Sequence, residues 1–216
     1  SGWGEYDDVY KLFPYGGVRN GDLMEYLNAR GFDCHAATVA PAGSAWDRAC
    51  ELYAQLMGTV TDYGEAHSKK CGHARFGKDY SECRLINDWS AEKKVNLFGH
   101  SFGGATVRML AELMANGDEG EKISSDVSPL FTGGKSSWIY SIVTLSSPHN
   151  GTTAYCVSHN AAAAITNGFN SAASVIPKLS DNALYDMMID NAMALNERIS
   201  TVSDIYYFSY ACDGTY

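Results

Sequence analysis

The stretch Lys94-Val-Asn-Leu-Phe-Gly99-His100-Ser101-Phe102-Gly103-Gly104-Ala105 decides the fold that we expect of this chain. Its first half is a short apolar run, and residues 106–115 place apolar side chains at helical spacing, so the pattern predicts a strand, a sharp turn and a helix. Ser101 lies at the turn, in the G-x-S-x-G pattern of a nucleophile elbow. The flanking glycines are needed because the turn is strained and the two segments pass close together. An accidental match is the alternative in a chain with 21 glycines, but it would not bring a strand and a helix with it.

Size and composition indicate one globular domain. The chain has 216 residues, of which 45% are apolar and 19% are charged. Its formal charge of −9 argues against a nucleic-acid partner, because no basic surface is implied. No apolar stretch approaches the roughly 18 residues that a membrane-spanning helix needs. The first residues, Ser1-Gly-Trp-Gly, lack the pattern of a signal peptide, as expected both of a trimmed secreted protein and of a cytosolic one.

Strands and helices alternate along the sequence, which predicts a mostly parallel sheet with helices on both faces. We expect a single domain over residues 1–216, with active residues at the carboxyl ends of its strands. Residues 62–89 form a long polar segment with poor periodicity, and such a segment in a compact domain is usually functional or anchored. The expected helices cover 22–29, 44–57, 106–115 and 181–199, and the expected strands cover 32–39, 138–145, 205–210 and the run before the elbow.

Motifs spread over most of the chain give a family resemblance. With them the chain resembles the zinc-containing bacterial lipases of the bacillus type, relatives of the staphylococcal and clostridial lipases and esterases. The resemblance implies an α/β-hydrolase fold, hydrolysis of carboxylic esters and secretion. In chain order the motifs are Gly2-Trp3-Gly4, Gly16-Gly17-Val18-Arg19, Trp46-Asp47-Arg48-Ala49-Cys50-Glu51, Asp62-Tyr63-Gly64-Glu65-Ala66-His67, Gly72-His73-Ala74-Arg75-Phe76-Gly77, the elbow itself, and Ser147-Pro148-His149-Asn150-Gly151-Thr152-Thr153.

The oxyanion hole is predicted only in part. The elbow directs the first free N–H groups of its helix to the place where an oxyanion would form, and Phe102 supplies one of them. In the family, a second N–H comes from a strand ending in His-Gly-Phe, just before the residues that match Ser1-Gly-Trp-Gly, and the sequence does not contain that strand. The family's lid segment is longer than residues 150–180, and its catalytic Asp and His lie beyond the strand matching 205–210. We therefore expect this chain to be a part of the active enzyme.

The general base stays unassigned. A serine hydrolase of this fold places an acid and then a histidine after the nucleophile, and two histidines follow Ser101. His149 belongs to a turn motif, and His159 lies among small residues with no carboxylate suitably placed before it. Asp213 follows the last strand but lacks the Asn-Asp-Gly setting that the family shows.

Two histidines and nearby carboxylates in the irregular segment suit a tetrahedral metal ion, although a solvated histidine loop would give the same spacing. The resemblance implies a structural Zn²⁺ held by Asp47, His67, His73 and Asp181, with no position left for a catalytic water. Asp181 is the least certain of these, because Asp186 and Asp190 lie close in sequence. Such an ion would pin the polar segment onto the domain.

Two functions remain open. The first is a secreted lipase or esterase in which Ser101 forms an acyl-enzyme, with ester or lipid substrates and transient contact with a lipid interface. A short lid would favour short acyl chains or a polyester. The second is a non-catalytic, zinc-stabilised fragment or binding module. Cys71 and Cys83 bracket His73, and a disulfide between them would close a loop of about a dozen residues.

Overall fold

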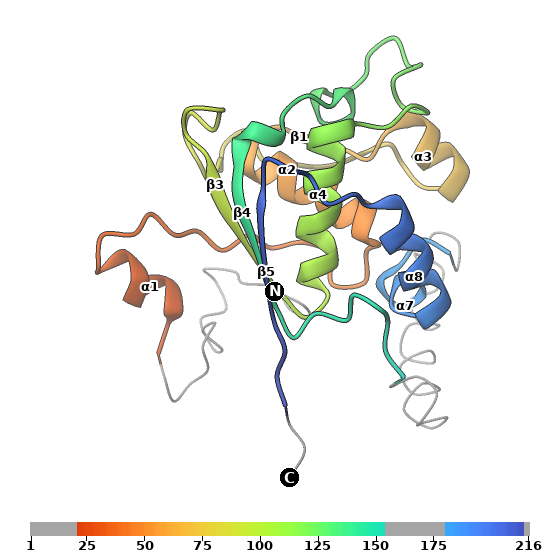
Figure 1. Ribbon diagram of the computed structural model, residues 1–216. Coiled ribbons are helices and arrows are strands. Elements are labelled where there is room, and N and C mark those ends of the chain that lie inside the picture. Colours follow the sequence, from red (N-terminus) through yellow and green to blue (C-terminus); the bar gives the residue numbers. More distant parts are fainter. Residues whose placement is uncertain (1–20, 154–179, 214–216) are drawn as a thin grey trace.

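The computed structural model describes residues 21–153 and 180–213 of the chain (Figure 1). Its centre is a parallel sheet of three strands in the order β3-β4-β5, formed by Val95–His100, Ile139–Leu145 and Tyr206–Tyr210. Leu97 pairs with Ile142 and Ile142 with Tyr207, and the register between β3 and β4 shifts once, between Val95 and Asn96. A parallel sheet connected through helices is an α/β arrangement, as the alternating sequence pattern predicts.

The other elements surround this sheet. The helices are α1 (Leu23–Asn28), α2 (Ala45–Met57), α3 (Glu65–Cys71), α4 (Gly103–Asn116), α7 (Ala183–Asp186) and α8 (Ile189–Arg198), with short 3₁₀ turns η1 (Pro129–Thr132) and η2 (Ser136–Trp138). A separate antiparallel pair is made by β1 (Val60–Asp62) and β2 (Phe76–Asp79). None of the helices in the described ranges has the length and apolar character needed to cross a membrane.

The core lies between the sheet and the helix that follows the elbow. Helix α4 packs on β3 and β4, and α2 packs on α4 (Figure 1). Leu110 of α4 is fully buried, and Ile142 of β4 is 1% exposed. On the opposite face of the sheet, Phe98 and Phe208 are about half exposed. Within the part of the chain that the structure describes, the expected helical cover is therefore observed on one face.

The helices α1 and α2 start where the sequence predicts them, whereas α4 begins at Gly103, three residues before the expected helix. Asp22 accepts hydrogen bonds from Met24 N and Glu25 N, and Ser44 accepts one from Asp47 N. A side-chain oxygen at the first position satisfies backbone N–H groups that have no partner inside a helix. The single helix expected over 181–199 is wrong, because the chain breaks at Met187 and forms α7 and α8.

The strand expected over 32–39 is also wrong, because no described strand lies beside this segment. Its backbone is hydrogen-bonded by side chains of α2 instead. The Gln55 amide bonds both Thr38 N and Thr38 O, at 3.0 and 2.7 Å, and Glu51 Oε2 accepts from Ala40 N. An apolar groove of about 630 Å³ separates the segment from β3.

The segment 62–89 is more regular than its composition predicts, since it contains α3, β2 and the end of β1. An arginine anchors it at two points. Arg75 forms a two-pronged ion pair with Asp62, at 2.9 and 2.8 Å, and reaches Asp126 at 2.9 Å. Such bidentate pairs are geometrically specific, which suits a segment of low intrinsic regularity.

Candidate active site and metal centre

The turn between β3 and α4 has the geometry of a nucleophile elbow. Ser101 has a φ of 55°, one of three positive values among described residues that are not glycine. Strain of this kind persists only where the surroundings impose it, and it clusters at functional sites. Ser101 N–H donates to Leu145 O at 3.0 Å, which ties the turn to β4. A Cβ on Gly99 would lie 2.5 Å from Gly103 O, so glycine is required there.

Phe102 is the N-cap residue directly before α4, and buried neighbours hold it in place. Its ring is completely buried, and its carbonyl accepts from the Thr106 N–H and hydroxyl, both at 3.3 Å. The buried Arg48 donates from Nε to Thr106 Oγ1 at 3.0 Å, and its guanidinium lies 5.0 Å from the Phe102 ring centroid. Burial lowers the pKa of Arg48 to about 10, which still leaves it charged at neutral pH. These contacts fix the peptide expected to supply an oxyanion donor.

His149 has a neighbour at hydrogen-bonding distance from each of its ring nitrogens. Its Nε2 lies 3.1 Å from Thr144 Oγ1, and its Nδ1 lies 3.3 Å from Arg108 Nη1. Burial and the nearby Arg108 charge lower the pKa of His149, so the ring stays neutral and Nδ1 accepts. Asn196 Nδ2 donates to the His149 carbonyl, which joins the turn to α8. No histidine of the described ranges is hydrogen-bonded to Ser101, and His159 lies outside those ranges.

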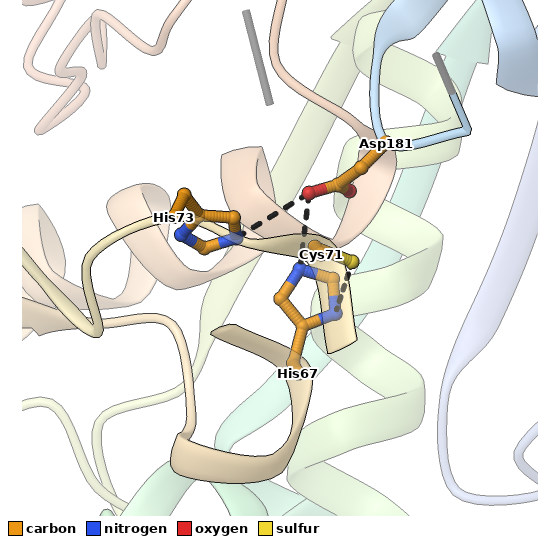
Figure 2. A group of neighbouring side chains, drawn as sticks. All are labelled: His67, Cys71, His73 and Asp181. Atoms are coloured by element: carbon orange, nitrogen blue, oxygen red, sulfur yellow. Dashed lines mark hydrogen bonds and ion pairs between the residues drawn. The ribbon is translucent and has the colours of Figure 1, made fainter. Parts of the chain in front are cut away.

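Four of the predicted metal ligands converge on one point, although they come from separate elements. Asp47 lies in the first turn of α2, His67 in α3, His73 just after it, and Asp181 just before α7. The Nε2 of His67 lies 3.1 Å from Asp47 Oδ1 and 3.4 Å from Asp181 Oδ2. The Nε2 of His73 lies 3.8 and 3.3 Å from the same two oxygens (Figure 2 shows the Asp181 side).

These separations fit a tetrahedral ion. Ligand atoms about 2.0 Å from such an ion lie roughly 3.3 Å from one another, close to the distances observed. Two of the four atoms, His73 Nε2 and Asp181 Oδ2, are buried and have no hydrogen-bond partner within the described part of the chain. A buried polar atom without a partner is costly, so an ion bound between them would remove the penalty.

The electrostatics of the group also suit a cation. Burial alone would lower the pKa of His67, but the carboxylates of Asp181 and Asp47 outweigh it and raise the pKa to about 9. Burial would raise the pKa of Asp181, and its contact with His67 lowers it instead. The two carboxylates therefore favour positive charge at this point of the interior.

Neighbouring groups orient the two imidazoles. His73 Nδ1 lies 2.8 Å from Ala74 O, so it carries the proton and Nε2 is left with its lone pair facing the carboxylates. Trp46 stacks on His67, with ring centroids 4.9 Å apart. The buried carboxylate of Glu121 accepts from Ala66 N and His67 N, which fixes the first turn of α3. Gly64, with a φ of +93°, leaves the room for that carboxylate.

The sequence favours Asp181, with Asp186 and Asp190 as nearby alternatives, and the three side chains lie in different surroundings. Asp181 faces the histidines, Asp186 accepts from Ala45 N at the start of α2, and Asp190 is exposed. The proposed disulfide is wrong, because Cys71 and Cys83 are both free thiols. Cys71 turns toward the histidines, and Cys83 is exposed. His67, Cys71, His73 and Asp181 each place one donor atom within 4.8 Å of the others, and Cys71 is the one of these that the sequence does not predict as a ligand.

Comparison with known proteins identifies the family. The model of the lipase-like C-terminal domain matches residues 6–172. Lipase 2 of Staphylococcus aureus is 42% identical over 155 residues, which cover 68% of this chain and 22% of that protein. Among solved structures, EstA from Clostridium botulinum is 36% identical with a TM-score of 0.77, over 92% of this chain and 54% of that one. Staphylococcus hyicus lipase is 30% identical with a TM-score of 0.82, over 95% and 63%.

The matched proteins are longer than this chain, which spans about a fifth of the S. aureus relative. The lipase resemblance seen in the sequence is confirmed by these matches. The chain belongs to the lipase-like family defined by this C-terminal domain.

Proposed function

We propose that this chain carries the nucleophile of a carboxylic-ester hydrolase with an α/β-hydrolase fold. The observation that supports this most directly is Ser101, held at a positive φ between the carboxyl end of β3 and the start of α4. Ser146, directly after β4, also has a positive φ, so the support comes from the φ of Ser101 together with its position between β3 and α4. Relatives that carry the name lipase point to the same chemistry.

In the proposed reaction, Ser101 Oγ attacks the ester carbonyl carbon while its proton passes to an imidazole. The alcohol then leaves, and water hydrolyses the resulting acyl-enzyme. The Phe102 N–H donates to the oxyanion, in a position fixed by Thr106 and Arg48. The described residues supply no imidazole to Ser101, so the base is expected from another part of the protein.

We assign the cluster of Asp47, His67, His73 and Asp181 to a structural Zn²⁺. Two nitrogens and two oxygens at tetrahedral spacing suit this ion. When bound, the ion would supply charge neutralisation and a rigid link between α2, α3 and α7. The ester and lipid substrates, the extracellular location and transient contact with a lipid interface are part of the same proposal and follow from the family.

The test is substitution of the nucleophile in the full-length protein. Ser101→Ala should lower the rate of p-nitrophenyl ester hydrolysis by several orders of magnitude, because the remaining groups stabilise the transition state only weakly. Its melting temperature should stay close to that of the wild type. Ser81→Ala, an exposed serine far along the chain from the elbow, is the control and should keep full activity. Substantial turnover by Ser101→Ala would favour the non-catalytic binding module instead.

A further inference from the structure

The metal pocket contains one more donor than a tetrahedral ion needs. Cys71 is the last residue of α3, one helical turn after His67, and it is 8% exposed. Its Sγ lies 3.8 Å from His67 Nδ1. The donor atoms of Cys71, His67, His73 and Asp181 all lie within 4.8 Å of one another (Figure 2).

Packing alone does not account for this thiol. A buried free cysteine is usually a small apolar residue in the core. Cys71 instead points toward polar side chains, the imidazole of His67 and the carboxylate of Asp181 (Figure 2). That carboxylate is itself nearly completely buried, and its Oδ2 has no hydrogen-bond partner in the described ranges. A cation bound beside Cys71 would give this buried Asp181 oxygen the partner that it lacks.

Asp47 is the ligand that can be replaced most easily. Its side chain is 14% exposed, against 3% for that of Asp181. Its Oδ1 lies 3.8 Å from His73 Nε2, the longest of the four contacts, and 3.1 Å from His67 Nε2, so one imidazole holds it more closely than the other. As a carboxylate in the first turn of α2 it also stays favourably placed without a metal, because the helix start attracts negative charge.

We infer that Cys71 is a fifth donor, which takes the place of Asp47 when the site binds a thiophilic cation such as Cd²⁺. The inference rests on the metal centre proposed above. Binding would transfer the thiol proton to solvent and give a shell of two imidazoles, one carboxylate and one thiolate. Thiolates favour soft cations, whereas Zn²⁺ accepts either a carboxylate or a thiolate. Asp47 would therefore be the fourth ligand for Zn²⁺, and Cys71 would be the fourth ligand for a softer cation.

The experiment is a crossed metal titration of the full chain after a chelator has removed its metal. Cd²⁺ should bind with a stoichiometry of one and produce a thiolate-to-cadmium charge-transfer band in the ultraviolet. Cys71→Ser should lose the band and bind Cd²⁺ at least about tenfold more weakly, with a smaller effect on Zn²⁺. Asp47→Asn should weaken the binding of Zn²⁺ more than that of Cd²⁺, and it should keep the charge-transfer band. Cys83→Ser, which removes an exposed thiol, is the matched control and should behave as the wild type.

The possible outcomes test the role of Cys71 separately from the proposed zinc site. Cd²⁺ binding without the band, or with a band that persists in Cys71→Ser, would overturn the role of Cys71 and leave the zinc site standing. Binding of neither ion would remove the metal centre itself. If Cys71→Ser fails to fold, the Cd²⁺ titrations of the wild type and of Asp47→Asn still test the inference. Absence of the charge-transfer band from both proteins would contradict it.

Discussion

The elbow and the metal pocket are built in opposite ways. The elbow consists of consecutive residues, and its special feature is a backbone angle at Ser101 between two glycines. The pocket consists of ordinary backbone, and its special feature is the meeting of side chains separated by more than 130 positions, from Asp47 to Asp181. One site depends on local strain and the other on the packing of the whole domain.

This contrast predicts that the two sites are sensitive to different kinds of substitution. A strained turn is destroyed by a single methyl group, because the neighbouring backbone leaves no room for it. A pocket of four converging ligands is destroyed by loss of any ligand or of the ion, since the remaining charges are left buried and unbalanced. Substitutions that separate these two modes of failure test the distinction.

The largest effect is expected at the elbow backbone. Gly99→Ala would place a Cβ 2.5 Å from Gly103 O, and relief requires movement of the start of α4. We expect a loss of about 3 kcal/mol or more in the free energy of unfolding, at the upper end of overpacking costs. Urea denaturation measures it. Gly31→Ala, at a φ of +85° with open space around it, is the control and should cost only about 1–2 kcal/mol. Equal losses in the two variants would contradict the steric argument.

The next effect concerns the pocket. Removal of bound metal should lower the melting temperature by roughly 10 °C, the change expected for loss of about 4 kcal/mol of ligand stabilisation in a domain of this size. Asp181→Asn should melt low with or without a chelator, because the site is already broken. Asp190→Asn removes an exposed carboxylate from the same region and should keep the full response to the chelator. A response that survives in Asp181→Asn would place the metal elsewhere.

The smallest effect is the pH dependence that His149 contributes. Its folded-state pKa lies below the unfolded value of about 6.5, so the unfolded chain binds the proton more readily. Its contribution to stability is therefore complete above pH 6.5 and is lost as the pH falls below that value. His149→Gln should flatten the fall in stability between pH 7 and pH 5. His35→Gln, at an exposed histidine in the segment 32–39, is the control for loss of one imidazole, and an equal flattening there would argue against this account.

The sequence predicts local features well, for reasons that these sites illustrate. The elbow and the caps at Asp22 and Ser44 depend on residues within a few positions of one another, so pattern and chemistry agree. The segment 32–39 has the composition of a strand, but a strand also needs a neighbour. In the described part of the molecule, the Gln55 side chain of α2 bonds the backbone of Thr38 in place of a neighbouring strand. The hydrophobic periodicity of the sequence does not reveal such a contact.

The metal pocket shows that contacts between residues far apart in the chain are hard to predict from the sequence. The family resemblance brings Asp47, His67, His73 and Asp181 together, while spacing along the chain could not choose Asp181 over Asp186. Cys71 was considered for a disulfide because it brackets His73 in sequence. The position of its side chain depends on how α3 is oriented, and that orientation is set by Glu121, 50 residues later. The one available signal was its spacing of four from His67, which places both on one helix face.

The most direct test of the account is covalent trapping of the nucleophile in the full-length protein, with and without metal. A fluorophosphonate ester should label one serine, identified as Ser101 by peptide mapping, because only an activated serine attacks such a reagent. At low temperature, where the metal-free fold is intact, the labelling rate should change little on chelation, since the ion stabilises the domain and takes no part in the reaction. Labelling of another residue would contradict the assignment of Ser101, and labelling that requires metal under those conditions would contradict the separation of the two sites.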